Sequence, residues 1–161
     1  QGCSRNCKGC FNPETHSFSA GYDISVDKLY FMISNEFGIE GLTISGGEPL
    51  EQMDGIISLI NTIRQKTSLS VLIYTGYNEE EVKARPGGNL LLSITDVLIS
   101  GPYMESKRTE ESVITSSNQK IILLSDRYTY TDIMSSYDME IHIDASGKLI
   151  MTGYENIFKE R

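Results

Sequence analysis

Three cysteines lie within the first ten residues of this 161-residue chain, and no other position holds one. Cys3, Cys7 and Cys10 follow the spacing C-x3-C-x2-C. A [4Fe–4S] cluster takes one thiolate per iron, so three cysteines leave one iron free to bind a substrate or a cofactor. An odd number of closely spaced cysteines does not suit a disulfide framework. The spacing therefore predicts an iron–sulfur cluster with one open coordination position, in a protein of the reducing cytoplasm.

Two other interpretations of the cysteines stay open. A structural zinc site would use His16 as the fourth ligand beside three thiolates, because short C-x2-C pairs are common in zinc sites. Three unrelated thiols are the second alternative. For His16 itself, a place in an ordinary loop is the simpler expectation.

A second motif, formed by Ser45, Gly46, Gly47, Glu48 and Pro49, directly follows a short apolar run. Two consecutive glycines allow a backbone to come close to a ligand. The glutamate adds negative charge or orders the loop. Taken alone, the motif is equally typical of a tight turn.

The rest of the chain alternates short apolar runs with amphipathic ones, which predicts βα units and a parallel sheet. Ser25 and Asn78 are typical helix N-caps. The expected helices cover 26–37, 53–63 and 79–85, and the expected strands cover 42–44, 70–74, 97–99 and 120–124. Alternating residues from Met139 to Ile143, followed by turn residues 144–147, predict a short C-terminal β-hairpin.

Three polar segments come just after predicted strands: 45–49, Thr75-Gly76-Tyr77 and Ser100-Gly101-Pro102. Ligands of parallel α/β folds bind at the carboxyl edge of the sheet. Thr75 and Ser100 are therefore candidate ligand contacts. The chain opens inside the cysteine motif, so we expect a first strand before residue 1, which would bring the cysteines to the same edge.

Composition and charge exclude several classes of function. The net charge of −8 argues against a broad nucleic-acid surface, which needs lysine and arginine to replace counterions. No run of 18 or more apolar residues is present, so no membrane span is expected. Length and apolar content suit one soluble domain over 1–161.

The two motifs together, in this order and about one βα unit apart, resemble the radical S-adenosylmethionine (SAM) superfamily. A narrower resemblance covers most of the chain. It is to the small activating proteins of anaerobic ribonucleotide reductase and, more distantly, to pyruvate formate-lyase activating enzymes. The segments that carry it are 1–3, 9–12, 75–77, 96–103, 116–120 and 141–154.

The resemblance implies a partial (β/α)6-type barrel with parallel strands, in which SAM chelates the fourth iron of the cluster. It implies reductive SAM cleavage, hydrogen abstraction from a glycine of a large partner enzyme, and a flavodoxin- or ferredoxin-type electron donor. No catalytic side chain is expected beyond the cluster ligands. The implied SAM contacts are Ser45, Gly46, Gly47, Glu48, Pro49, Thr75, Ser100 and Asn118.

Two positions depart from the family pattern. Ser100 stands where aspartate is usual, which puts a contact to the SAM ribose in doubt. Lys120 stands where arginine is frequent, which keeps the charge but loses the bidentate fork.

Alternative functions remain at this level: a radical SAM enzyme acting on a small molecule or peptide, or a non-catalytic metal-binding module. The polar segment 103–117 is either a lid or docking loop or, more simply, a solvated loop. Tyr74, Tyr77 and Tyr103 either stack on adenine or pack against the protein, and packing is the commoner role.

Overall fold

The computed structural model of the chain describes residues 1–109, 113–134, 139–143 and 149–153. A four-stranded sheet runs through its centre, with strand order β1-β2-β3-β4. The strands are β1 (Gly41–Ile44), β2 (Ser70–Thr75), β3 (Val97–Ser100) and β4 (Lys120–Leu123). The first three are parallel, and Thr75 at the end of β2 pairs with Ser100 at the end of β3. The carboxyl ends of these strands therefore meet at one edge of the sheet.

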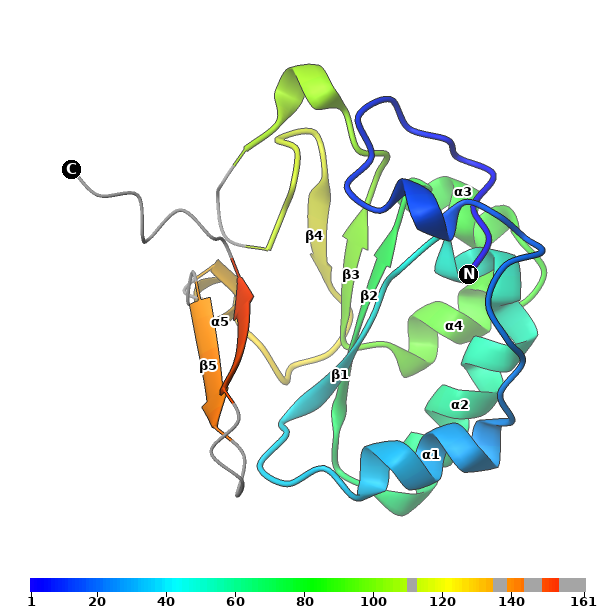
Figure 1. Ribbon diagram of the computed structural model, residues 1–161, viewed down its shortest axis with the longest axis vertical. Coiled ribbons are helices and arrows are strands. Elements are labelled where there is room, and N and C mark those ends of the chain that lie inside the picture. The colour runs from blue at the N-terminus through cyan, green and yellow to red at the C-terminus, as the bar shows by residue number, and fades with distance from the viewer. Residues whose placement is uncertain (110–112, 135–138, 144–148, 154–161) are drawn as a thin grey trace.

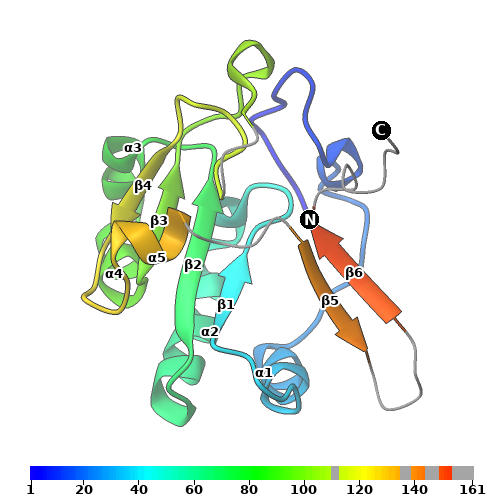
Figure 2. The same cartoon turned by 90° about the vertical axis from the view of Figure 1, so that its left-hand side faces the viewer.

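Helices cover the sheet on one face, as Figure 1 shows for α1 to α4. They are α1 (Val26–Ser34), α2 (Met53–Lys66), α3 (Glu79–Ala84) and α4 (Gly88–Ile94). On the other face lie α5 (Tyr130–Met134) and the antiparallel pair β5 (Met139–Ile143) and β6 (Leu149–Gly153), seen from the front in Figure 2. Three short 3-10 helices complete the described elements: η1 (Pro13–Thr15), η2 (Pro49–Gln52) and η3 (Glu105–Lys107).

The two helix starts that the sequence predicts are confirmed. The Ser25 hydroxyl accepts a hydrogen bond from the Lys28 amide at the start of α1. At α3, Asn78 and Glu81 form a reciprocal capping box, which satisfies two amides that the first turn leaves without a helical partner.

Apolar side chains fill both faces of the two central strands. Between the sheet and the helices the buried residues include Leu50, Ile60, Val71, Ile73, Leu91 and Leu98. On the opposite face Val97 and Ile99 pack with Ile114 and Ile133. Strands buried on both sides need continuous apolar runs, which is why the sequence of β3 does not alternate.

A buried acidic group joins four elements at the opposite edge of the sheet. Asp96, directly before β3, accepts hydrogen bonds from Arg64 of α2 (2.6 Å), the Val71 amide of β2 (2.7 Å) and Ser125 after β4 (2.7 Å). Only 3% of its surface is exposed. These contacts give Asp96 a structural role at the start of β3 rather than a catalytic one.

The direction of β4 differs from the expected all-parallel arrangement. This strand is antiparallel to β3, with Lys120 paired to Ser100. For β4 to run parallel to β3, the chain would first have to cross back to the amino-terminal ends of the strands. Instead, the connecting segment folds at the carboxyl edge through η3 and a bridge between Arg108 and Ser116. The partial six-stranded barrel stays a prediction, and the turn expected at 144–147 lies outside the described residues.

Three features of the helices also differ from the expected pattern. The first helix ends at Ser34, because the Asn35 side chain caps it by donating to the Phe31 carbonyl, and Phe37 is left 95% exposed. The α4 helix begins after Gly87, whose left-handed φ of 79° starts a new helix where the sequence indicated only the end of α3. The short α5 was missed as well. No helix within the described ranges has the length and apolar character needed to cross a membrane.

Candidate functional site

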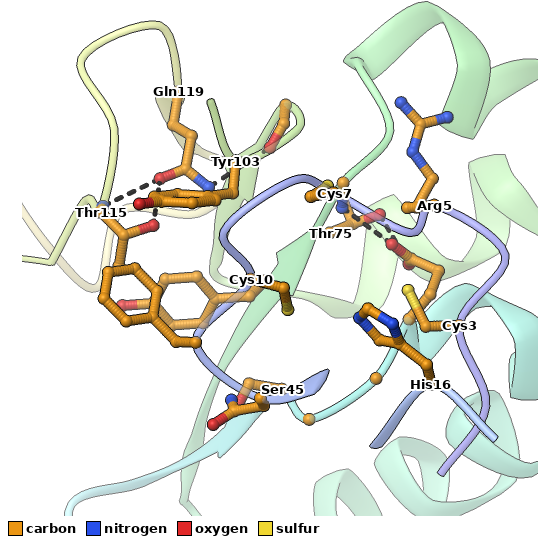
Figure 3. Close-up of a pocket in the computed structure, with 18 residues that line it drawn as sticks. Cys3, Arg5, Cys7, Cys10, His16, Ser45, Thr75, Tyr103, Thr115 and Gln119 are labelled. Atoms are coloured by element: carbon orange, nitrogen blue, oxygen red, sulfur yellow. Dashed lines mark hydrogen bonds between the residues drawn. The ribbon is translucent and has the colours of Figure 1, made fainter. Parts of the chain in front are cut away.

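A cavity of about 310 Å³ opens at the carboxyl edge of the sheet (Figure 3). The segment 1–12, which carries the three cysteines and is called the cysteine loop below, covers the strand ends there. It collects residues from the N-terminal segment, from the turns after β1, β2 and β3, and from the segment before β4. Its lining residues are Cys3, Arg5, Cys7, Cys10, Phe11, Asn12, His16, Ser45, Gly46, Gly47, Glu48, Tyr74, Thr75, Gly76, Gly101, Tyr103, Thr115 and Gln119.

Backbone hydrogen bonds fasten the cysteine loop to its surroundings. The Gly2 amide donates to the Thr15 carbonyl (2.9 Å), and the Cys3 amide donates to the His16 carbonyl (3.1 Å). The Glu48 amide in turn donates to the Gly2 carbonyl (2.8 Å). The cysteine motif and the Gly-Gly motif, which are far apart in the sequence, are thus joined directly through their backbones.

All three cysteines are free thiols of intermediate exposure. Burial raises the pKa of Cys7, and a backbone hydrogen bond with Tyr103 opposes that shift. Within the described part of the chain, no three His, Cys, Asp or Glu side chains gather closely enough to hold a single metal ion. A [4Fe–4S] cube has a different requirement, since it spreads its thiolates over separate irons.

The two glycines of the second motif have different structural roles. Gly46 has a φ of 116°, a backbone conformation that favours glycine, and its Cβ position faces open space in the cavity. At Gly47 an added Cβ would overlap the Gly2 carbonyl oxygen and would lie 2.9 Å from the Thr15 carbonyl oxygen. The second glycine therefore serves close contact with the cysteine loop, which the sequence could not distinguish from contact with a ligand.

The Glu48 carboxylate holds the turns after β1 and β2 together. Its two oxygens accept from the Leu50 amide (3.0 Å), the Thr75 hydroxyl (2.8 Å) and the Gly76 amide (2.8 Å). Only 2% of the residue is exposed, and burial raises the pKa of Glu48 against the effect of these donors. Of the two roles that the sequence allowed for this residue, ordering the loop is the one that its contacts describe.

Behind the cysteine loop, Tyr77 lies between two arginines. The guanidinium carbons of Arg5 and Arg85 lie 4.6 and 3.9 Å from its ring centroid. The Tyr77 hydroxyl donates to Glu51 (3.0 Å), which also accepts from the Ser4 hydroxyl (2.5 Å). The Ser4 bond is the main reason that the pKa of Glu51 is lowered.

Not all predicted contacts reach the cavity. Ser100 is buried and donates its hydroxyl to the Tyr77 carbonyl (3.0 Å), and only its neighbour Gly101 lines the cavity. Asn118 donates to the Pro102 carbonyl (2.8 Å) and Pro49 is buried at the start of η2, so neither belongs to the lining.

Two residues that sequence reasoning missed occupy the rim on the side of β4. Gln119 accepts from the amide and hydroxyl of Thr115 (2.9 and 3.0 Å) and donates to the Gly101 carbonyl (3.3 Å). Both line the cavity (Figure 3). The sequence could have indicated Gln119, because it lies in the segment 116–120 that resembles the family, next to the predicted contact Asn118.

Among the described residues, two buried side-chain atoms have no hydrogen-bond partner: Nε2 of His16, which lines the cavity, and Oδ1 of Asn118, which does not. Buried polar atoms are normally paired, since leaving one unpaired costs about 1–3 kcal/mol. Together with three free thiols around the same cavity, the unpaired His16 atom fits a site that is completed by a bound polar group.

The tyrosines and the segment 103–117 have mixed roles. Tyr77 packs in the core, which is the commoner of the two roles expected for these tyrosines. Tyr74 and Tyr103 line the cavity. The Tyr103 ring packs on Phe11 with centroids 4.9 Å apart. Ile114 and Ser116 are buried, so the second half of the segment is not a plain solvated loop. Residues 110–112 lie outside the described ranges.

Comparison with known proteins defines the class of this site. The profile of the family described as "4Fe-4S single cluster domain" matches residues 1–122, which include the cysteine loop, the Gly-Gly motif and the first three strands. The chain therefore belongs to the 4Fe-4S single cluster domain family. This assignment supports an iron–sulfur cluster in preference to the zinc alternative.

More specific relatives carry the name anaerobic ribonucleoside-triphosphate reductase-activating protein. The protein of Pasteurella multocida is 30% identical over 134 residues, which cover 79% of this chain and 85% of that protein. That of Haemophilus influenzae is 28% identical over 128 residues (75% and 81%), and that of Enterobacteria phage T4 is 27% identical over 125 residues (74% and 78%). No solved structure matches the chain. The predicted resemblance to these activating proteins is confirmed.

Proposed function

We propose that this protein is a radical SAM activase that generates a glycyl radical on a partner enzyme, namely an anaerobic ribonucleotide reductase. The observation that carries the proposal is the convergence of three free thiols, the Gly46-Gly47 turn and two strand ends on one cavity. The names of the relatives support the choice of partner.

Cys3, Cys7 and Cys10 would hold a [4Fe–4S] cluster and leave one iron for SAM. The bound cluster would supply the reductive cleavage of SAM, with one electron from a flavodoxin- or ferredoxin-type donor, and this chemistry would remove a hydrogen atom from a glycine of the partner. The protein's own residues position the reactants and exclude water.

The SAM-binding residues divide by what their contacts allow. Ser45, Gly46 and Gly47 line the cavity and would contact the methionine part of SAM. Glu48 and Thr75 would position that turn through their mutual hydrogen bond.

Four further residues would act at the edge of this site. Pro49 and Ser100 would support it from the buried side, and Asn118 would position the turn after β3 through its hydrogen bond to the Pro102 carbonyl. Gln119 joins the proposal as a lining residue.

A protein substrate suits the rim of the cavity better than a small molecule does. The cavity is lined by four residues that are themselves exposed, so an extended segment of a partner could reach it: Phe11, Asn12, Ser45 and Gly46.

We also propose that the sheet is part of a partial six-stranded barrel in one domain.

The test is anaerobic reconstitution with iron and sulfide, followed by addition of dithionite and SAM. We expect about four irons per chain, formation of 5′-deoxyadenosine, and an electron paramagnetic resonance (EPR) doublet of a glycyl radical on purified anaerobic ribonucleoside-triphosphate reductase. The variants Cys3→Ala, Cys7→Ala and Cys10→Ala should each lose SAM cleavage, whereas the surface variant Ser17→Ala should keep it.

Each failure has its own meaning. A colourless protein with one tightly bound zinc would identify a metal-binding module. SAM cleavage without a radical on the reductase would point to a small-molecule or peptide substrate. SAM cleavage that persists in the three cysteine variants would refute the proposed site.

A further inference from the structure

His16 takes no part in the proposed function so far, yet its ring is aimed into the same cavity as the cysteine sulfurs (Figure 3). Its backbone carbonyl accepts from the Cys3 amide (3.1 Å), and the preceding residue, Thr15, accepts from the Gly2 amide (2.9 Å). The backbone at His16 is therefore held directly against the first cysteine.

The buried Nε2 atom of His16 has no hydrogen-bond partner among the described residues. A neutral imidazole carries one N–H donor and one acceptor nitrogen, and burying an unpaired one is unfavourable. Because His16 lines the cavity, a group bound there would supply the missing partner.

We propose that His16 is a positioning residue that donates a hydrogen bond from Nε2 to a sulfur of the bound [4Fe–4S] cluster and thereby raises its reduction potential. This inference rests on the proposed function, because it needs the cluster in place. Hydrogen bonds to cluster sulfurs stabilise the additional negative charge of the reduced state, which is one of the means by which proteins set cluster potentials.

A sulfur is favoured over SAM as the acceptor because of where His16 is attached. The backbone carbonyls of Thr15 and His16 accept hydrogen bonds from Gly2 and Cys3, which belong to the cysteine loop. The rim formed by Thr115 and Gln119 comes from a different segment, before β4, and would be free to contact SAM instead.

The experiment compares the parent protein with His16→Phe, which keeps an aromatic ring but loses the donor, and His16→Gln, whose amide restores an N–H donor. Ser17→Ala is the control for a change in the same segment. The midpoint potential of the cluster is measured by EPR-monitored redox titration, first without and then with SAM, and iron and sulfide contents are measured in parallel.

We expect His16→Phe to retain its iron and to titrate at a more negative potential. The expected change in the reduction equilibrium is about tenfold, which corresponds to about 59 mV for one electron. His16→Gln should recover most of that shift, and Ser17→Ala should match the parent. An unchanged potential in His16→Phe without SAM would overturn the inference, and a shift that appears only with SAM would assign the bond to SAM instead.

A second measurement covers the case in which His16→Phe fails to fold. Pulsed EPR of the reduced cluster in protein labelled with 15N-histidine should show a weak coupling to one histidine nitrogen, absent from His16→Gln. A strong coupling would make His16 an iron ligand, and no coupling would refute the inference. If the parent binds no cluster at all, it is the proposed function that fails.

Discussion

Replacing Asp96 with asparagine is expected to lower the free energy of unfolding by about 3 kcal/mol. One carboxylate oxygen of Asp96 accepts from Arg64 (2.6 Å) and the Val71 amide (2.7 Å), and the other accepts from Ser125 (2.7 Å). An asparagine would keep one acceptor oxygen but turn an NH2 group toward at least one of these donors. It would also leave the Arg64 guanidinium without its counter-charge.

The magnitude follows from the burial of this group. Removing one partner of a buried ion pair costs about 3–5 kcal/mol. Arg64 is 26% exposed and also donates to the Ile94 carbonyl, so the lower end of that range applies. The surface variant Glu79→Gln is the matched control, because it removes an exposed pair with Lys83 that contributes well under about 1 kcal/mol.

The cost of Asp96→Asn should depend on pH in a defined direction. Burial opposes ionisation of Asp96, but the bonds from Ser125, Arg64 and the Val71 amide outweigh it and lower its pKa below the ordinary value of 3.8. The stabilisation is therefore present above about pH 3.8 and is lost as the pH falls through the folded-state pKa. The difference between parent and variant should be constant near neutrality and shrink in acid.

The assay is urea unfolding of the reduced apoprotein, followed by far-ultraviolet circular dichroism at several pH values. An Asp96→Asn protein as stable as the Glu79→Gln control would refute the structural role of Asp96. A loss of SAM cleavage in a variant that remains folded would reopen a catalytic role for it.

Three further substitutions test the contacts between the cysteine loop and the strand ends. Gly47→Ala should displace the loop, because its Cβ overlaps the Gly2 carbonyl, and iron content per chain should fall while Ser17→Ala binds iron normally. Glu48→Gln should cost about 2 kcal/mol in urea unfolding, since the Gly76 amide loses its acceptor. The raised pKa of Glu48 means that its stabilisation is greatest in acid and declines as the pH rises through the folded-state pKa, so this cost should be larger at pH 5 than at pH 7. Tyr77→Phe should keep the contacts of its ring with both arginines and lose the hydroxyl's bonds to Glu51 and Ser4, lowering stability by about 1 kcal/mol, and an unchanged unfolding midpoint would argue against those bonds.

Elements that depend on neighbouring residues could be predicted from the sequence. The caps at Ser25 and Asn78 form within three residues of the helix start, and the apolar runs at 70–74 and 97–99 are long enough to indicate buried strands. The α4 helix could not be predicted in the same way. It begins on a left-handed Gly87 without a side-chain cap, and it is stabilised by burying Leu91 and Leu92 rather than by local signals.

The candidate site shows the same division. Spacing alone determined that three thiols could share one cluster and that the Gly-Gly turn follows a strand, because ligand number and strand periodicity are local properties of the chain. Tertiary structure decided that Gly47 packs on Gly2, that Glu48 ties two turns, and that Gln119 rather than Asn118 lines the cavity. Those outcomes depend on the relative positions of segments far apart in the sequence, which are set by the register of β1, β2 and β3 and by the reversed direction of β4.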